Sequence, residues 1–259
     1  MRIGAILQAR MSSSRLPGKV LKPLLGRPML EVELDRLRKS KRLDVLAVAT
    51  SVDASDDAIE SFCRARGLAC YRGSLNDVLD RYYQAARAAG LDVVVRVTGD
   101  CPLIDPAIVD LVIEQFLERG VDYCANTVPP DDSTFPDGTD VEVFSFAALE
   151  RAWREARKPS EREHVTFYLW QTPGLFKTSR VDWKEKLTDY RLTVDYPDDL
   201  DFVAAVLAEL EKKKQAGSMT EVIALLKEKP ALMEINKGKV RNAGWQSAFE
   251  KDKKAGFAS

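Results

Sequence analysis

The first 19 residues constrain this chain most, because an apolar strand leads there directly into a cationic loop. Ile3 to Leu7 is an apolar run, and the loop from Gln8 to Lys19 carries two arginines, three serines, a Pro-Gly pair and a lysine. Freed backbone N–H groups beside hydroxyl and cationic side chains suit a polyphosphate, since fixed dipoles and charges need little rearrangement to meet it. The loop lacks the Gly-x-x-x-x-Gly-Lys-Ser/Thr pattern, which disfavours the chemistry of P-loop nucleotide hydrolases.

Strand-length apolar runs alternate with helix-period segments through the first half of the chain. This alternation is typical of repeated βα units around a largely parallel sheet. Apolar residues three and four positions apart, with charges on the opposite face, predict the covering helices. The expected strands are Ile3–Gln8, Val45–Thr50, Ala69–Tyr71 and Val93–Thr98, and the expected helices are Met29–Lys39, Asp56–Arg66 and Asn76–Ala89.

The second half of the chain continues the same pattern less regularly. Asp105, followed by Pro106, is a better N-cap than Asp100 for a helix that runs to about Arg119. A loop rich in Pro and Asp, from Thr127 to Gly138, is expected to form a lid or a wall of the site. The expected strands lie near Tyr123 and over Thr139–Phe144, Phe176–Val181 and Arg191–Val194, and the expected helices are Phe146–Arg157, Glu161–Trp170, Asp198–Lys214 and Thr220–Lys227.

A domain boundary is predicted at Gly217-Ser218. The preceding helix ends in a lysine cluster, and the glycine and serine read as a helix stop followed by a new N-cap. The main domain is therefore expected to span residues 1–217, with a C-terminal helical and basic extension over residues 218–259. Trp245 and Phe249 stand at helical spacing in this extension, which we interpret as a packing or dimer element.

Composition excludes several functional classes. The 259 residues carry a formal net charge of -1, so no global charge favours nucleic acid or an anionic membrane surface. One histidine and four cysteines without a Cys-x-x-Cys pair argue against structural zinc and a disulfide framework, so reduced, mostly buried thiols are expected. No leader-like segment or membrane-spanning apolar run is evident, so a cytoplasmic protein is expected.

The run from Gln8 to Leu30 resembles the signature of sugar-acid cytidylyltransferases, which make CMP-activated 3-deoxy-manno-octulosonate and acylneuraminates. It is most similar to the branch of spore-coat polysaccharide biosynthesis proteins. The resemblance implies an α/β, nucleotide-diphospho-sugar transferase-like (Rossmann-like) three-layer sandwich with a mixed, mostly parallel sheet. It also implies a homodimer and a reaction that joins CTP to an acceptor hydroxyl and releases pyrophosphate.

The resemblance also implies a Mg²⁺ site. Val93–Thr98 ends in Gly99-Asp100-Cys101-Pro102, which is similar to the family's Gly-Asp-x-Pro motif, whose aspartate holds the metal. The edge of an open α/β sheet where such a strand ends is also where ligands bind. Val194–Leu200 resembles the family's Val-Asp-x-Pro-x-Asp-Leu motif, so Asp100 and Asp195 are the expected ligands. Cys101 replaces a residue that is often acidic in the octulosonate enzymes, which points to a different acceptor.

The remaining site residues are assigned by the same resemblance. Arg15 and Lys19 are expected to act on the phosphates as catalytic residues. The expected nucleotide-binding residues are Gln8, Ala9, Arg10, Ser14, Arg72, Asp77, Arg81 and Thr98, and the expected acceptor-binding residues are Asp140, Glu142 and His164. Asn76 serves equally well as a helix N-cap or a nucleotide contact, and His164 is as readily a satisfied structural residue as an acceptor ligand.

Two other functions compete with cytidylyl transfer to a small hydroxylated, acidic acceptor. A nucleotide-sugar glycosyltransferase has a similar sheet but normally holds its metal with an Asp-x-Asp pair, and no such pair follows a predicted strand. A nucleotide-sensing scaffold would keep the loop without turnover, and the presence of both candidate metal carboxylates argues against it. The choice of cytosine rests on the resemblance alone.

Overall fold

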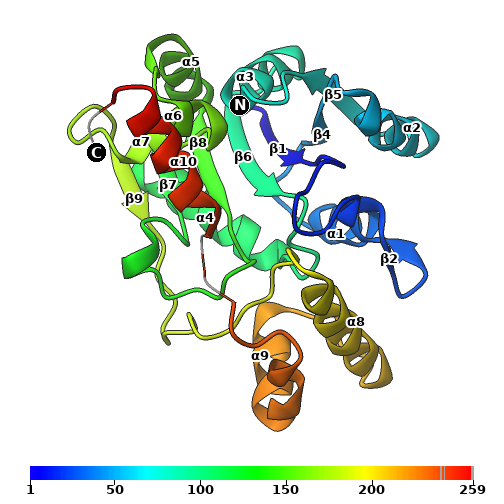
Figure 1. Ribbon diagram of the computed structural model, residues 1–259. Helices are drawn as coiled ribbons and strands as arrows, with labels where there is room; N and C mark the ends of the chain where they lie inside the picture. The colour runs from blue at the N-terminus through cyan, green and yellow to red at the C-terminus, as the bar shows by residue number, and fades with distance from the viewer. Residues whose placement is uncertain (240, 242, 258–259) are drawn as a thin grey trace.

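The computed structural model describes residues 1–239, 241 and 243–257, and in that part of the chain seven strands form one central sheet. The strand order is β5-β4-β1-β6-β8-β7-β9 (Figure 1). The four strands from β5 to β6 are mutually parallel, whereas β8 runs antiparallel to both of its neighbours. The strands are β1 (Ile3–Gln8), β4 (Val45–Ser51), β5 (Ala69–Gly73), β6 (Val93–Thr98), β7 (Tyr123–Ala125), β8 (Glu142–Ser145) and β9 (Thr178–Arg180).

Both faces of the sheet are buried, and the alternation of side chains along β1 and β6 shows why. Ala5 and Leu7 pack into the core on one face, while Ile6 between them packs into the core on the other. Val93 and Val95 alternate with Val94 in the same way along β6. A strand that is apolar at every position therefore folds as a central strand with helices on both sides.

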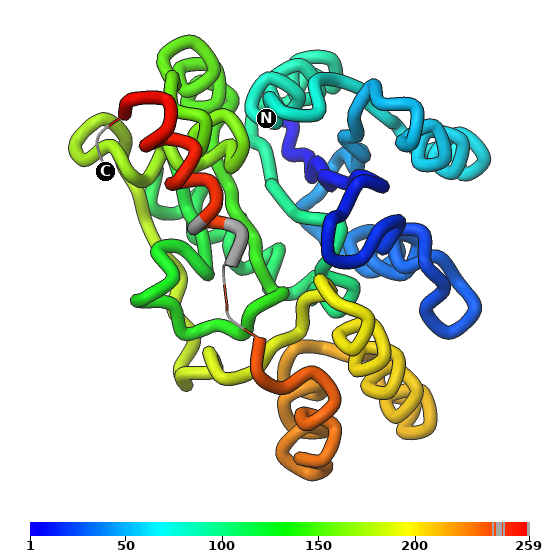
Figure 2. The backbone as a smooth tube through the Cα atoms, in the orientation of Figure 1, coloured from blue at the N-terminus to red at the C-terminus, as the bar shows by residue number. Residues whose placement is uncertain are grey.

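Helices cover the two faces and complete three layers (Figures 1 and 2). The first core contains apolar residues of α1 (Met29–Leu37), α2 (Asp57–Ala65) and α4 (Pro106–Arg119). The second contains residues of α3 (Val78–Ala88), α5 (Phe146–Glu155) and α7 (Phe167–Trp170). The predicted α/β three-layer architecture with a mixed, mostly parallel sheet is confirmed.

The C-terminal third lies against the main body at two separate places. Helices α8 (Pro197–Lys212) and α9 (Met219–Glu228) share a third apolar cluster with Leu24 of the hairpin β2–β3 (Pro23–Leu24 and Arg27–Pro28). Helix α10 (Ala243–Lys254) instead packs on α6 (Pro159–Glu163), on the opposite side of the molecule (Figure 2). Helices α9 and α10 both contact elements of residues 1–217. The predicted domain boundary at residue 217 stays a prediction.

Most predicted elements are present within a few residues of their expected bounds, and the differences lie in the second half. The expected strand Arg191–Val194 is absent from that described stretch, where Arg191 forms a single bridge with Asp137. The expected helix Glu161–Trp170 is broken into α6 and α7, and Val165 between them has a φ of 59°. For the helix α3, Asp77 rather than Asn76 is the N-cap, since its carboxylate accepts from the Asp80 N–H at 2.9 Å.

The expected strand Thr139–Phe144 begins only at Glu142. Before that point, the side chain of Asn126 makes the hydrogen bonds that a neighbouring strand would otherwise make. Asn126 donates from Nδ2 to the Thr139 carbonyl at 2.7 Å and accepts at Oδ1 from the Val141 N–H at 2.9 Å. These bonds satisfy backbone groups that a neighbouring strand would otherwise pair. Residues 137–141 are thereby free to turn toward the carboxyl end of β6 instead of continuing the sheet.

All four cysteines are free in the structure. Cys63, Cys101 and Cys124 are buried, and Cys70 is partly buried. None of the helices in the described part of the chain is both long enough and apolar enough to span a bilayer.

Gly138 joins two distant segments through close backbone contact. Its φ is 93°, and an added Cβ would lie 2.4 Å from the Thr193 nitrogen and 2.6 Å from the Leu192 carbonyl carbon. Gly138→Ala should therefore lower the free energy of unfolding by about 3 kcal/mol or more, through backbone strain and overpacking together.

Gly174→Ala is the matched control, measured in the same urea denaturation series. Its φ is 78°, but its Cβ would meet no described atom within 4 Å. Only the left-handed backbone conformation is then penalised, at a cost of about 1 kcal/mol. Equal losses in the two variants would show that the contact with residues 192–193 does not constrain the fold.

Candidate active site

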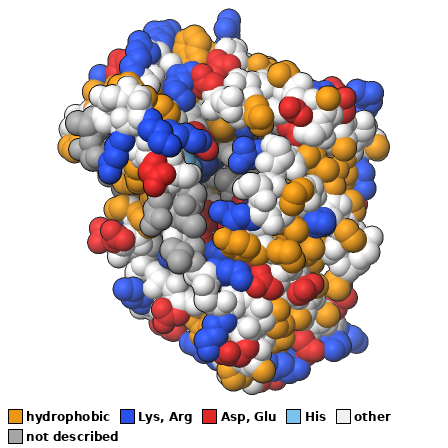
Figure 3. Space-filling model, in the orientation of Figure 1, with side chains coloured by type: hydrophobic (Ala, Val, Ile, Leu, Met, Phe, Trp, Pro, Cys, Tyr) orange, Lys and Arg blue, Asp and Glu red, His pale blue; other side chains and the backbone are white. Residues whose placement is uncertain are grey.

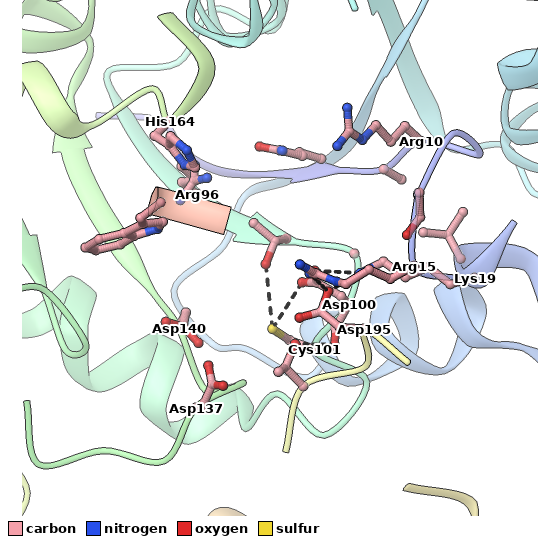
Figure 4. Close-up of a pocket in the computed structure, with 18 of the residues that line it drawn as sticks. Arg10, Arg15, Lys19, Arg96, Asp100, Cys101, Asp137, Asp140, His164 and Asp195 are labelled. Carbon is pink, nitrogen blue, oxygen red and sulfur yellow. Dashed lines mark hydrogen bonds and ion pairs between the residues drawn. The ribbon is translucent and has the colours of Figure 1, made fainter. Parts of the chain in front are cut away.

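A polar pocket opens where β1 and β6 end side by side, with Gln8 paired in register with Thr98. One half is lined by the loop after β1 and by Asp100 and Asp195, and the other by residues of the segments 137–142 and 163–164. Figure 4 shows this division, with Arg15, Lys19, Asp100 and Asp195 on one side and Asp137, Asp140, Arg96 and His164 on the other. In the space-filling view, Lys and Arg side chains gather around a hollow where the only histidine is visible (Figure 3).

The loop after β1 is held in a tight turn by its own backbone and by one buried carboxylate. Met11 accepts from the N–H groups of Ser13 at 3.0 Å and Gly18 at 2.8 Å, which folds the loop back on itself. Gly18 has a φ of 68°, a conformation that favours glycine. Asp56, which is buried, accepts from the Met11 N–H at 2.7 Å and anchors the loop to the end of β4.

Lys19 connects this loop to both predicted metal ligands. Its Nζ donates to Asp100 Oδ2 at 2.9 Å, to Asp195 Oδ1 at 3.0 Å and to the Val194 carbonyl at 2.8 Å. The ammonium has three donors, so these three bonds satisfy it although the residue is only 9% exposed. Burial works to lower the pKa of Lys19, but the charges of Asp100 and Asp195 outweigh burial and raise it, so Lys19 stays protonated.

Asp195 is surrounded by cations. Arg15 Nη2 lies 2.6 Å from Oδ1, and Arg191 Nη2 lies 3.1 Å from Oδ2. Burial would raise the pKa of Asp195, but Lys19 and Arg15 outweigh burial and hold it well below its usual range. Two carboxylates from distant segments of the chain therefore meet at one point, where the cations offset the repulsion between them.

The donor set at this point fits a hard divalent cation that also binds phosphate oxygens. Asp100 lines the pocket, and the hydrogen bond to its Oδ1 among the described groups is a weak one from the Cys101 thiol at 3.6 Å. Mg²⁺ usually takes one or two protein carboxylates and completes its shell with substrate phosphates and water. No cluster of three or more His, Cys, Asp or Glu suited to a metal occurs among the described residues.

The other half of the pocket carries carboxylates as well. Asp137 is held by Arg191, whose Nη1 donates to Oδ2 at 2.7 Å, and Asp140 accepts from the Gly138 N–H at 2.8 Å. Burial, together with the charge of Asp140, raises the pKa of Asp137 to about 7. Glu142 is buried in an ion pair with Arg96 and accepts from the Tyr123 hydroxyl at 2.7 Å and from Thr166. Its carboxylate is therefore largely committed to the fold.

His164 lines the pocket beside these carboxylates. Its ring stacks on Phe167 at a centroid distance of 4.5 Å, and its Nε2 has no hydrogen-bond partner among the described residues. Burial and the charge of Arg96 lower the pKa of His164 to about 4. At neutral pH the imidazole is therefore uncharged, and its Nε2 is itself buried.

The pocket unites most of the predicted site residues. It brings together Gln8, Ala9, Arg10, Ser14, Arg15, Lys19, Thr98, Asp100, Asp140, Glu142, His164 and Asp195. These residues come from five separate segments of the chain and line one pocket. The chemical role of each residue stays a prediction.

Three predicted nucleotide contacts, Arg72, Asp77 and Arg81, are not among the residues that line this pocket. Arg72 is engaged by Asp57 at 2.7 Å and Glu60 at 2.9 Å, and Asp77 caps α3 and pairs with Arg162 at 2.5 Å. Arg81 is buried, and its Nε and Nη1 find no hydrogen-bond partner in the described part of the chain. The pocket therefore gives Arg72 and Asp77 no support as nucleotide contacts, while Arg81 retains unused donors.

Arg191 has no role predicted from the sequence and Trp245 is predicted only to belong to a packing or dimer element, yet both line the pocket. Arg191 was expected to be one residue of a strand, and no motif distinguishes it from an ordinary charged position. Trp245 comes from the C-terminal extension, and its spacing with Phe249 indicates a helix but not the surface on which that helix packs.

Comparison with known proteins agrees with this geometry. The family model described as "Cytidylyltransferase" matches residues 4–230. An uncharacterized protein of Methanocaldococcus jannaschii is 37% identical over 254 residues, which cover 96% of this chain and 100% of that protein. The spore coat polysaccharide biosynthesis protein SpsF of Bacillus subtilis is 34% identical over 232 residues, covering 87% of this chain and 94% of SpsF.

Solved structures show the same relationship. A cytidylyltransferase from Leptospira borgpetersenii superimposes with a TM-score of 0.84 at 32% identity, covering 93% of this chain and 100% of that chain. Proteins named 3-deoxy-manno-octulosonate cytidylyltransferase are also among the relatives. The resemblance stated from Gln8–Leu30 is confirmed.

The low pKa of His164 predicts a stability change with pH. An unfolded histidine titrates near 6.5 and the folded one near 4, so the unfolded chain binds the extra proton between these values. Stability should fall as the pH is lowered through this window, and His164 should account for about 1 to 2 kcal/mol between pH 7 and pH 5. Chemical denaturation of the native protein and of His164→Gln at both pH values isolates the contribution of His164 to this change in stability. Identical pH dependence in the two proteins would contradict it.

Proposed function

This chain belongs to the cytidylyltransferase family, and on that basis we propose that it transfers CMP from CTP to a hydroxyl of a sugar acid or related acceptor and releases pyrophosphate. The observation that carries the proposal is the junction at Lys19, where the loop after β1 meets Asp100 and Asp195. A phosphate-binding loop and two converging carboxylates are the two parts that nucleotidyl transfer needs beside a positioned nucleophile.

The phosphates of CTP would lie against the loop after β1. Arg10 and Arg15 line this half of the pocket with the hydroxyls of Ser13 and Ser14. Arg15 is about one-third exposed, so its guanidinium can turn from Asp195 toward a phosphate. The cationic side chains hold and orient the α-phosphate and stabilise the charge that develops on the leaving pyrophosphate. Arg81 is buried and does not line the pocket, so its contact with the nucleotide is carried over from the family only.

Asp100 and Asp195 would hold a Mg²⁺ ion, since their oxygens suit a hard cation and substrate phosphates would complete its shell. When bound, such an ion supplies neutralising charge at the α-phosphate and the leaving pyrophosphate. Lys19 holds the two carboxylates together and helps keep the pKa of Asp195 low, which favours them as ligands. The identity of the metal as Mg²⁺ is likewise proposed.

The acceptor would enter the half of the pocket lined by Asp137, Asp140 and His164. Carboxylates and a neutral imidazole accept hydrogen bonds, so these groups favour an acceptor with several hydroxyls. The relationship to SpsF supports a role in surface polysaccharide or glycan biosynthesis. A homodimer is carried over from the family as part of the same proposal.

Calorimetric titration with CTP, UTP, GTP, ATP and dTTP, with and without Mg²⁺, tests the nucleotide. We expect CTP to bind best and Mg²⁺ to strengthen its binding, after which pyrophosphate release identifies the acceptor from a panel that includes 3-deoxy-manno-octulosonate and N-acetylneuraminate. Preference for another nucleotide would overturn the substrate, and absence of nucleotide binding would favour the scaffold function.

Asp100→Asn tests the carboxylate at the centre of the site. Loss of its charge should reduce turnover by about 100-fold or more, because metal-assisted stabilisation of the α-phosphate is lost. Binding of CTP without Mg²⁺ should change by less than about 3-fold, because the phosphate-binding side chains remain. Asp201→Asn, an identical change at an exposed position of α8, should leave both unchanged. Undiminished turnover in Asp100→Asn would remove Asp100 from the mechanism.

A further inference from the structure

Helix α10 lies beyond residues 4–230, the region that the family model matches, and yet it reaches the pocket. Trp245 and Ser247, both on α10, line the same half of the pocket as Asp140, Glu163 and His164. The wall that faces the acceptor thus contains residues from outside the matched region.

Polar contacts near its C-terminal end hold helix α10 against the main domain. Asp252 is buried and accepts from the Ser160 N–H at 2.8 Å and from the Ser160 hydroxyl at 2.5 Å. Lys251 Nζ lies 2.6 Å from Glu163 Oε2. Ser160 and Glu163 belong to α6, and His164 follows as the C-cap of that helix. The anchor of α10 is therefore built on the segment that presents His164.

Trp245 is held by aromatic neighbours on one side and faces the pocket on the other. Its ring centroid lies 4.9 Å from that of Phe167, 5.9 Å from Trp170 and 6.3 Å from His164. Edge contacts of this kind orient an aromatic ring. The indole is half-buried and belongs to the pocket lining, so part of it remains available to a ligand.

An oriented indole beside carboxylates is a chemical match for a sugar ring. The hydroxyls of such a ring donate to carboxylates such as Asp137 and Asp140, while its C–H face is apolar and packs on an aromatic surface. The nucleotide half of the pocket has no aromatic lining residue in the described part of the chain, so this combination marks the acceptor half.

We propose that Trp245 is a specificity-determining residue that packs against the sugar ring of the acceptor, so that the C-terminal helix selects the acceptor while the strands β1 and β6 position the nucleotide. The inference rests on the proposed function for the existence of an acceptor. It assigns to the extension a role in the site in addition to packing.

Steady-state kinetics of the full-length protein test this role, with the acceptor of the panel that gives the fastest pyrophosphate release. Trp245→Ala should raise the KM for the acceptor about 10-fold, as expected for loss of one aromatic contact, and leave the KM for CTP within about 2-fold. Phe249→Ala is the matched control, because Phe249 stacks on the same Phe167 at 5.7 Å from the same helix but does not line the pocket. Equal effects of the two variants on the acceptor KM would overturn the proposal.

A second measurement does not depend on turnover. The four tryptophans can be labelled with 5-fluorotryptophan and their ¹⁹F resonances assigned by Trp→Phe variants. Addition of 3-deoxy-manno-octulosonate or N-acetylneuraminate should shift the Trp245 resonance and leave that of Trp183, which packs on Phe135 outside the pocket, unmoved. A Trp245 resonance that neither compound moves would overturn the proposal. Failure of the proposed function would show separately, as lack of preference for CTP in calorimetry.

Discussion

The triple contact of Lys19 is the interaction on which the site depends. One ammonium joins the loop after β1, the end of β6 and the segment before α8, although these lie far apart in the sequence. Without it, the two partly buried carboxylates would repel each other. The positive charge therefore holds Asp100 and Asp195 together and helps keep the pKa of Asp195 low.

The sheet supplies the frame for this contact. Because β1 and β6 are parallel neighbours, the loops that follow them leave from the same edge, and the antiparallel β8 begins at that edge too. The two halves of the pocket are consequently formed at neighbouring strands of one sheet. The loop after β1, which Asp56 anchors, carries the cations, and the turn at Gly138 carries the carboxylates.

Much of this arrangement could be predicted from local sequence, and the exceptions have physical causes. Largely apolar runs such as Val93–Thr98 identify central strands, and a carboxylate that follows one closely, as Asp100 does, lies at the edge of the sheet where ligands bind. The stretch at Thr139 was predicted wrongly as a strand because Asn126 takes the place of a strand partner. Trp245 could not be assigned to the pocket, since its place depends on an anchor at Ser160 that no periodicity reveals.

Arg191 gives the two halves of the pocket a thermodynamic connection. One guanidinium holds Asp137 at 2.7 Å and Asp195 at 3.1 Å, so a ligand that changes the charge or position of one carboxylate alters the field at the other. Linkage makes such an effect reciprocal in equilibrium binding. An acceptor that engages Asp137 and a cation that engages Asp195 would then change each other's affinity by the same factor, with this one side chain as the physical link between them.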